Sequence, residues 1–145
     1  MEKIIRKIEA ITPLPKRLRV AAYCRVSLGT EDMLHSLAAQ ISYYSEYIQG
    51  RRDWEYIGVY ADEARTGTKD NRPEFQRLIA DCRAGKIDLV LTKSISRFAR
   101  NTVTMLEISR ELKLLGIDIY FEEQRIHSLS DDGEFILTIL ASYVG

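Results

Sequence analysis

The segment YCRVS, residues 23–27, places a serine two residues after an arginine, directly behind the apolar run LRVAA. A serine hydroxyl is a poor nucleophile at neutral pH unless neighbouring groups activate it. A guanidinium makes paired hydrogen bonds with phosphate oxygens. If the strand predicted for this segment persists, Arg25 and Ser27 point to the same side of it. Ser27 therefore either caps a turn or attacks a phosphorus atom.

Three more arginines can join Arg25. In the segment SRFAR, Arg97 and Arg100 are three residues apart and share a face if the segment forms a helical turn. By itself this spacing is typical of two solvated arginines at the start of a helix. Arg72 comes from a loop between two predicted elements. Four guanidiniums around one hydroxyl need an anion to neutralise them, and phosphate is the anion that suits them.

Metal ligands and nucleotide-binding motifs are missing from these segments. His35 and His127 lie outside them and are typical of surface or cap positions. The acids of residues 131–134 precede an apolar run as a helix cap does, with no His or Cys set beside them. The sequence has no GxxxxGK[ST] loop. We expect a site with no metal and no cofactor, in which fixed cations stabilise a phosphoryl transition state.

Length and charge set broad limits. The 145 residues suggest one domain, and 21 basic against 21 acidic side chains leave no net charge that would favour a partner. Six Lys or Arg against two Glu in residues 1–20 predict a basic N-terminal arm over residues 1–17. No apolar run is long enough for a membrane span, and the N-terminus lacks a signal-peptide core. Cys24 and Cys82 lie in apolar settings, which favours buried free thiols and a cytoplasmic location.

Apolar periodicity predicts alternating strands and helices over residues 18–145. Strands are expected at 18–24, 54–62, 87–92 and 117–123, and helices over 34–48, from Pro73 to Gly85 and over 102–115. This order is typical of an α/β domain with a mainly parallel sheet of four to five strands flanked by helices. Functional groups of such sheets lie beyond the carboxyl ends of the strands. That rule places Ser27, the 63–72 loop and the 93–100 segment along one edge.

The C-terminal segment is unusually apolar. Asp131 stands three residues before Glu134, which is an acidic variant of a capping box. Eight of the ten residues from Phe135 to Val144 are apolar, so a helix here has to be covered on all sides. Its cover is the core of the domain, a second subunit, or both. We expect self-association through residues 134–145.

Five segments together resemble the catalytic domain of the serine site-specific recombinases, the resolvase/invertase family. They are YCRVS at 23–27, SLAAQ at 36–40, TGTKDNRPEF at 66–75, DLVLTKSISRFARNT at 88–102 and DDGEFILTILAS at 131–142. The resemblance covers residues 18–145 in the family's order. The SLAAQ and SRFARN forms are most similar to the large serine recombinases of phages and conjugative transposons.

The resemblance implies a role for individual positions. Ser27 matches the nucleophile that attacks a DNA phosphodiester and forms a 5′-phosphoserine link, without metal or ATP. Gln40 matches a glutamine that helps to order the site. Thr66 stands where small resolvases have a serine, and Ser96 where they have an aspartate, so the general acid and base stay unassigned; both positions are expected to contact phosphate or DNA. The family's phosphate-binding arginines match Arg25, Arg72, Arg97 and Arg100.

The resemblance also implies partners. These are double-stranded DNA at an attachment or resolution site, and further copies of the chain in dimers and tetramers that meet through residues 134–145. The family's dimerisation helix normally continues into an acidic–basic pair, and DNA-binding regions follow. Neither is present here, so the chain resembles a catalytic domain cut from a longer protein, with a shortened dimerisation helix.

Three functions compete at this point. The first is a DNA strand-exchange enzyme that serves integration, excision or resolution of a mobile element. The second is an inactive regulator or interaction module with the recombinase fold, against which the intact Ser27 and its four arginines count. The third is a generic doubly wound domain, and it is disfavoured because no acidic pair or glycine-rich turn follows the first strand. The spacing of Tyr43, Tyr44 and Tyr47 favours packing over base stacking.

Overall fold

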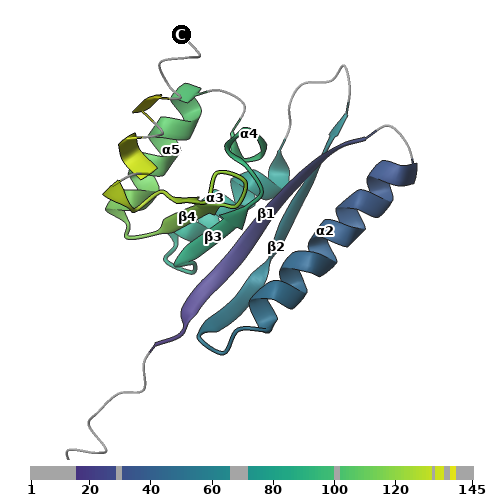
Figure 1. The fold of residues 1–145 in the computed structure, drawn as a ribbon, viewed down its shortest axis with the longest axis horizontal. Helices are drawn as coiled ribbons and strands as arrows, with labels where there is room; N and C mark the ends of the chain where they lie inside the picture. The colour runs from purple at the N-terminus through teal and green to yellow at the C-terminus, as the bar shows by residue number, and fades with distance from the viewer. Residues whose placement is uncertain are drawn as a thin grey trace, which may run out of the picture.

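The computed structural model describes residues 16–28, 31–65, 72–99, 102–131, 133–135 and 138–139 (Figure 1). Within them, five strands form one sheet in the order β2-β1-β3-β4-β5. The strands are β1 (Leu18–Leu28), β2 (Trp54–Arg65), β3 (Leu89–Thr92), β4 (Asp118–Phe121) and β5 (Ile126–His127). The first four run parallel, and β5 pairs antiparallel with β4. The predicted mainly parallel α/β fold is confirmed.

Helices cover both faces of this sheet. The described helices are α2 (Glu31–Gln49), α3 (Pro73–Arg83), α4 (Ile95–Phe98) and α5 (Thr102–Leu114). Helix α2 lies alone on one face, and the other three lie on the opposite side (Figure 1). Successive side chains of β1 point to opposite faces of the sheet. Ala21 and Tyr23 join the core under α3 and α5, whereas Val20, Ala22 and Cys24 join the core under α2.

The ends of α3 and α5 follow the sequence signals. Pro73 opens α3, where its missing N–H costs no helical hydrogen bond. Gly85 and Gly116 have φ values of 76° and 77°. Each lies just past a helix and lets the chain turn back, as glycine does at this position. Both helices therefore stop where the sequence analysis expects.

Strands β1 and β2 run further than predicted. Strand β1 continues past residue 24 to Leu28 because it pairs with β2 along its whole length, with Ser27 opposite Ala64, and because Val26 is buried under α2 like Cys24. Strand β3 is shorter, and its last pair with β1 is Thr92 with Tyr23. The carboxyl halves of β1 and β2 thus form a two-stranded ribbon that projects beyond the rest of the sheet (Figure 1). Ser27 lies within a strand and not after one.

The C-terminal segment begins differently from the prediction. Its described residues with helical backbone are 131, 133–135 and 138–139. The side-chain oxygen of Ser130 accepts a hydrogen bond from the Gly133 N–H at 2.9 Å, so Ser130 is the cap. The acidic capping box predicted at Asp131 is wrong, because Asp131 is already helical. The rest of the predicted 134–145 helix and residues 1–15 of the N-terminal arm lie outside the described residues.

The two cysteines are buried and free, as predicted. Burial is the main cause that raises the pKa of Cys24 and of Cys82 to about 12, so neither thiol is a nucleophile at neutral pH. In the part of the chain that is described, no helix is both long and apolar enough to cross a membrane.

An ion pair fastens β1 to the start of β3 at the amino end of the sheet. The Asp88 carboxylate accepts hydrogen bonds from the backbone N–H of Arg19 at 2.9 Å and from its guanidinium at 2.9 and 3.0 Å. The Arg19 carbonyl in turn accepts from the Asp88 N–H at 2.8 Å. The hydrogen bonds from Arg19 lower the pKa of Asp88. The charged form of Asp88 is therefore the one that the fold favours.

This pKa shift predicts a pH-dependent effect of Asp88→Asn. A carboxyl group whose pKa is lowered by folding stabilises the protein above its unfolded pKa of about 4, and this stabilisation is lost as the pH falls through the folded pKa. We expect Asp88→Asn to unfold at lower urea concentration than wild type at pH 7, and the gap to close below about pH 4. Urea titrations at a series of pH values measure both proteins. A gap that stays constant at acid pH contradicts the assignment.

Candidate active site

Strand β1 carries the candidate nucleophile and its nearest arginine. Arg25 pairs with Asp62 of β2, and Ser27 pairs with Ala64. The side chain of Arg25 is only 9% exposed, which is unusual for a charged group. The strand persists through Leu28, as the expectation that Arg25 and Ser27 share one side requires. The side chain of Ser27 lies outside the described part of the structure.

Helix α4 brings Arg97 against this strand. The guanidinium of Arg97 donates a hydrogen bond to the backbone carbonyl of Arg25, two residues before Ser27. The helix is a single turn, capped by the Ser94 hydroxyl, which accepts from the Arg97 N–H at 3.3 Å. Ala99 ends it with extended backbone, φ −144° and ψ 138°. Helix α4 therefore ends at Phe98, and Arg100, which was predicted to share a helical face with Arg97, lies outside the described residues.

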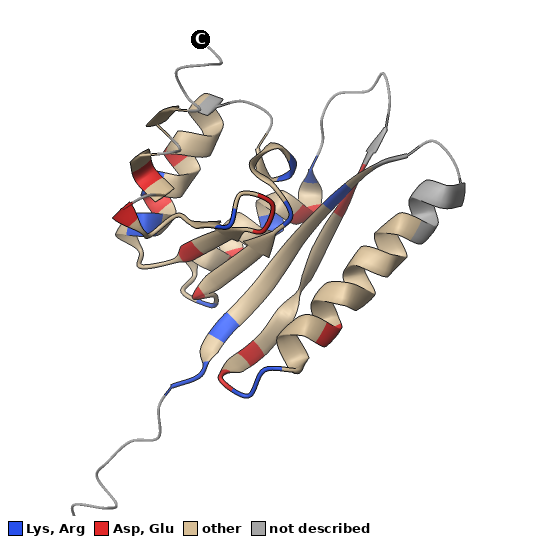
Figure 2. Ribbon diagram, in the orientation of Figure 1, with Lys and Arg blue, Asp and Glu red and all other residues tan. Residues whose placement is uncertain are grey.

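Arg72 joins the same group from the start of α3. Its guanidinium donates to the carbonyl of Phe98 at 2.7 Å and, more weakly, to that of Arg97 at 3.4 Å. It also lies over the ring of Phe75, 3.8 Å from the centroid, a favourable cation–π distance. Basic segments of β1, of α4 and of the start of α3 consequently lie close together (Figure 2). The structure brings Arg25, Arg72 and Arg97 together.

The remaining predicted residues stand apart from this group or are not described. Ser96 is exposed on α4, with its hydroxyl 3.1 Å from that of Ser94. Gln40 lies on α2, on the other side of the sheet, and its amide donates to the Ser36 hydroxyl at 3.4 Å. Gln40 also lines an open groove of about 400 Å³ between α2 and the ends of β3 and β4. Thr66 lies outside the described residues.

Arginine side chains that lie near one another can bind a tetrahedral anion. Fixed positive groups in a partly buried site stabilise negative charge that develops on phosphoryl oxygens. They do so without reorganising during the reaction, because their positions are set by the fold. A neighbouring hydroxyl would supply the nucleophile. The arrangement fits phosphoryl transfer on an anionic substrate.

A comparison with known families identifies the domain. The sequence model described as "Resolvase, N terminal domain" matches residues 20–144. The chain belongs to the resolvase family. The resemblance found in the sequence is thereby confirmed.

Solved structures of similar proteins agree with this assignment. A resolvase family site-specific recombinase from Streptococcus pneumoniae is 29% identical, with a TM-score of 0.71 over 88% of this chain and 87% of its own. The N-terminal catalytic domain of TP901-1 integrase is 28% identical, with a TM-score of 0.63 over 86% of this chain and 92% of its own. The Tn3 transposon resolvase of Escherichia coli is 25% identical over 126 residues, and this chain spans 61% of its length. The fold is therefore that of a serine recombinase catalytic domain.

A buried carboxylate that sequence reasoning missed supports the site of this resolvase-family domain. Asp62 is 4% exposed. Its carboxylate accepts from the Tyr23 hydroxyl at 2.8 Å and from the N–H groups of Glu74 and Phe75 at 3.0 and 2.9 Å. It thus caps α3 from the neighbouring strand. Because Arg72 directly precedes α3, the contacts of Asp62 with the first turn of α3 also fix the backbone position of Arg72.

Tyr23 completes this support. Burial and the hydrogen bond to Asp62 raise the pKa of Tyr23, so the phenol stays protonated and donates. Its ring packs edge-on against Phe75 and Phe98, at 5.2 and 6.4 Å between centroids. One sequence signal could have found the pair: an aspartate that ends an apolar strand and stands shortly before a helix with no side-chain cap of its own.

Removal of the Asp62 carboxylate should destabilise the domain. Asp62→Ala leaves a buried phenol and two helix N–H groups without their acceptor, and we expect a loss of about 3 kcal/mol in the free energy of unfolding. Asp53→Ala is the control, since Asp53 is exposed at a turn and such changes usually cost within about 0.5 kcal/mol. Urea denaturation measures both. Equal stability of the two variants would show that Asp62 does not hold α3.

Proposed function

We propose that this domain cleaves and rejoins DNA at specific sites through a covalent link between Ser27 and a 5′-phosphate. Membership of the resolvase family supports site-specific recombination. The observation that carries the chemistry is the contact of Arg97 with the Arg25 carbonyl, two residues from Ser27. This contact supports the proposal, because a guanidinium can bind phosphate and the contacted carbonyl is two residues before Ser27 in the chain.

The proposed reaction is a pair of phosphoryl transfers. The Ser27 oxygen attacks a DNA phosphorus, a serine–phosphorus bond forms, and the bond from phosphorus to the 3′-oxygen breaks. The serine loses its proton, and the departing 3′-oxygen gains one. Rejoining reverses these steps when the 3′-hydroxyl of another strand attacks the phosphoserine. Each step replaces one phosphoester bond by another, so ATP is not needed.

The arginines stabilise negative charge on the phosphate in this scheme. Negative charge on the phosphoryl oxygens is greatest in the transition state, and guanidiniums that are already in place stabilise it. In the proposal the phosphate is bound by Arg25 of β1, by Arg97 of α4 and by Arg72, which directly precedes α3. Arg100, Gln40, Thr66 and Ser96 keep the roles that the family resemblance implies, as part of the proposal. Double-stranded DNA is the proposed substrate.

Ser27→Ala should abolish covalent attachment to DNA. The variant lacks the nucleophilic oxygen, so a suicide substrate with a nick near the cleavage site should yield no protein–DNA adduct on a denaturing gel. The measurement uses the complete protein, with Ser42→Ala, an exposed serine on α2, as a control that cleaves normally. Melting curves check that both variants fold. An adduct formed by Ser27→Ala would exclude Ser27 as the nucleophile.

The same experiment tests the alternative function. An inactive regulator with this fold would bind DNA or protein, and the wild-type protein itself would give no adduct. The intact Ser27 of this chain and the proximity of Arg25, Arg72 and Arg97 in the fold favour the enzyme over the regulator. Integration, excision or resolution of a mobile element is the proposed setting, in keeping with the integrase and the transposon resolvase among the similar proteins.

Self-association through the C-terminal segment belongs to the same proposal. Phe135 and Ile139 are 66% and 38% exposed in the single chain. Val103 and Leu114 of α5 are exposed apolar residues as well. Exposed apolar surface of this kind is typical of contacts between subunits. A contact around a two-fold axis would bring like residues together.

A charge in this surface should prevent association. We expect Ile139→Lys to sediment as a folded monomer at concentrations where the wild-type protein forms dimers, because a lysine cannot be buried between apolar surfaces without cost. Tyr47→Lys, at a similarly exposed residue of α2, should leave association unchanged. Sedimentation velocity distinguishes the species. A wild-type chain that stays monomeric at high concentration contradicts the interface.

A further inference from the structure

The turn between β4 and β5, Glu122–Arg125, touches both helices that flank the candidate site. It begins where β4 ends, and the Glu122 and Glu123 N–H groups donate to the carbonyls of Thr92 and Lys93 at 3.0 and 2.8 Å. The Arg125 N–H closes it on the Glu122 carbonyl at 3.2 Å, and Arg125 has a positive φ of 54°. These bonds hold the turn against the segment that leads from β3 into α4.

One side chain of this turn supports α4. The side-chain oxygen of Gln124 accepts a hydrogen bond from the Ile95 N–H, the first of the helix, at 3.3 Å. A single helical turn is not stable alone, because its few hydrogen bonds do not offset the cost of ordering the backbone. It depends on partners for its end groups. Since Arg97 stands in this turn and reaches the Arg25 carbonyl, the placement of α4 decides the placement of Arg97.

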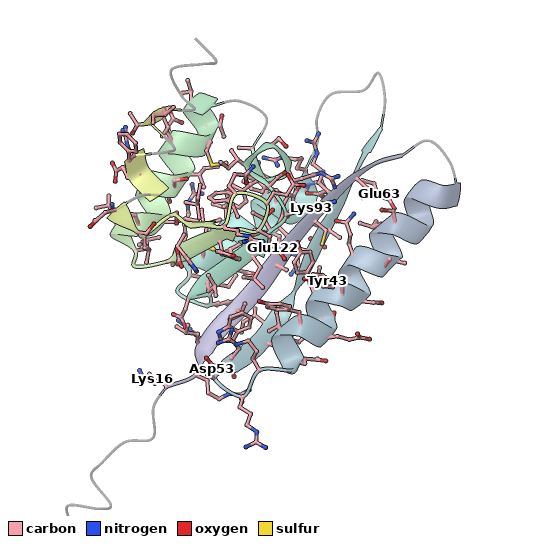
Figure 3. The ribbon with its side chains drawn as sticks, in the orientation of Figure 1. Lys16, Tyr43, Asp53, Glu63, Lys93 and Glu122 are labelled. Carbon is pink, nitrogen blue, oxygen red and sulfur yellow. The ribbon has the colours of Figure 1, made fainter. Side chains whose placement is uncertain are left out.

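A second side chain of the same turn holds α2. The Glu122 carboxylate accepts hydrogen bonds from the hydroxyls of Tyr44 and Tyr43, the latter at 3.3 Å. Tyr44 is 3% exposed. Burial and the hydrogen bond to Glu122 raise its pKa, so the phenol stays a donor. Tyr43, Lys93 and Glu122 lie together where α2 faces the ends of β3 and β4 (Figure 3).

Helix α2 affects the site because it follows Ser27 closely along the chain. It begins at Glu31, four residues after Ser27, so its position limits where the chain after the nucleophile can go. It packs on β1 and β2, whereas α4 follows β3 on the other side of the sheet. The Glu122–Arg125 turn contacts both helices and so connects the nucleophile side of the site to the arginine side.

We propose that Glu122 and Gln124 are positioning residues of the recombinase site, which together fix α2 and α4 relative to each other. Neither side chain has to touch the phosphate. Their effect passes through Tyr44 to the helix that follows Ser27, and through Ile95 to the turn that carries Arg97. The inference rests on the proposed function for its consequence in catalysis, and on the contacts alone for its consequence in structure.

The structural consequence is tested on the isolated domain. Gln124→Leu keeps the size of the side chain and removes the acceptor, whereas Gln124→Glu keeps an acceptor oxygen. We expect the Ala99 amide, which donates to the Ile95 carbonyl, to exchange its hydrogen roughly tenfold faster in Gln124→Leu and at the wild-type rate in Gln124→Glu. Unchanged exchange in Gln124→Leu would show that the turn does not support α4.

The catalytic consequence is tested in the complete protein on the suicide DNA substrate. Gln124→Leu and Tyr44→Phe should slow the first-order formation of the covalent adduct by about tenfold to a hundredfold, with the Kd for DNA unchanged, because misplaced reacting groups lower the rate and not the binding. Gln124→Glu should restore the rate. Tyr56→Phe is the matched control, since it also removes a phenol bonded to α2, to the Ser45 hydroxyl at 3.2 Å, but this phenol comes from β2 and not from the Glu122–Arg125 turn.

The outcomes separate this inference from the function on which it rests. A wild-type protein that forms no adduct contradicts the proposed function, and the exchange measurement still decides whether the turn holds α4. A wild-type protein that cleaves, together with Gln124→Leu and Tyr44→Phe that cleave equally fast, overturns the positioning role. Slow cleavage in Tyr56→Phe as well would show a general loss of helix packing and would likewise overturn it.

Discussion

One buried carboxylate fixes the geometry around which the rest of the domain is arranged. Asp62 has almost no contact with water, and a charge in that setting is tolerated only when hydrogen-bond donors surround it. Its donors come from β1 and from the first turn of α3, so strand and helix have to meet at this point. Arg72 precedes α3 and Tyr23 stands in the centre of β1. The position of Arg72 thus follows in part from the need to satisfy one acid.

The free domain holds its guanidiniums together in a way that the sequence does not suggest. Sequence reasoning required an anion, because like charges repel. In the structure, the backbone carbonyl of Arg25 accepts a hydrogen bond from Arg97, and that of Phe98 accepts one from Arg72. The Arg72 guanidinium also lies over the ring of Phe75. Carbonyl dipoles and a π face supply the partial negative charge that phosphate would otherwise supply. These contacts offset part of the positive charge of Arg72 and Arg97.

The sequence predicted the order and type of the elements well, because apolar periodicity and glycine stops such as Gly85 and Gly116 are local properties. It failed where pairing between distant segments decides the outcome. Strand β1 passes residue 24 because β2 lies beside it, and α4 ends at Phe98 because Ala99 turns extended. The matched motif placed Arg25, Arg72 and Arg97 in one site, but Asp62, Glu122 and Gln124 have no motif. The roles of Glu122 and Gln124 arise from contacts across the fold, which spacing along the chain does not reveal.

The ribbon of β1 and β2 gives the site a mechanical property. Ser27 lies four residues past Tyr23, the last residue of β1 that pairs with β3, which is an overhang of about 13 Å. A bend of roughly 5° at its base moves the tip by about 1 Å, a shift that can change a rate by about a hundredfold when reacting groups have to meet. Arg97 lies on α4 and Arg72 directly precedes α3, whereas Arg25 and the candidate nucleophile Ser27 both lie on the ribbon. A bend of the ribbon thus moves Ser27 and Arg25 together, relative to Arg72 and Arg97.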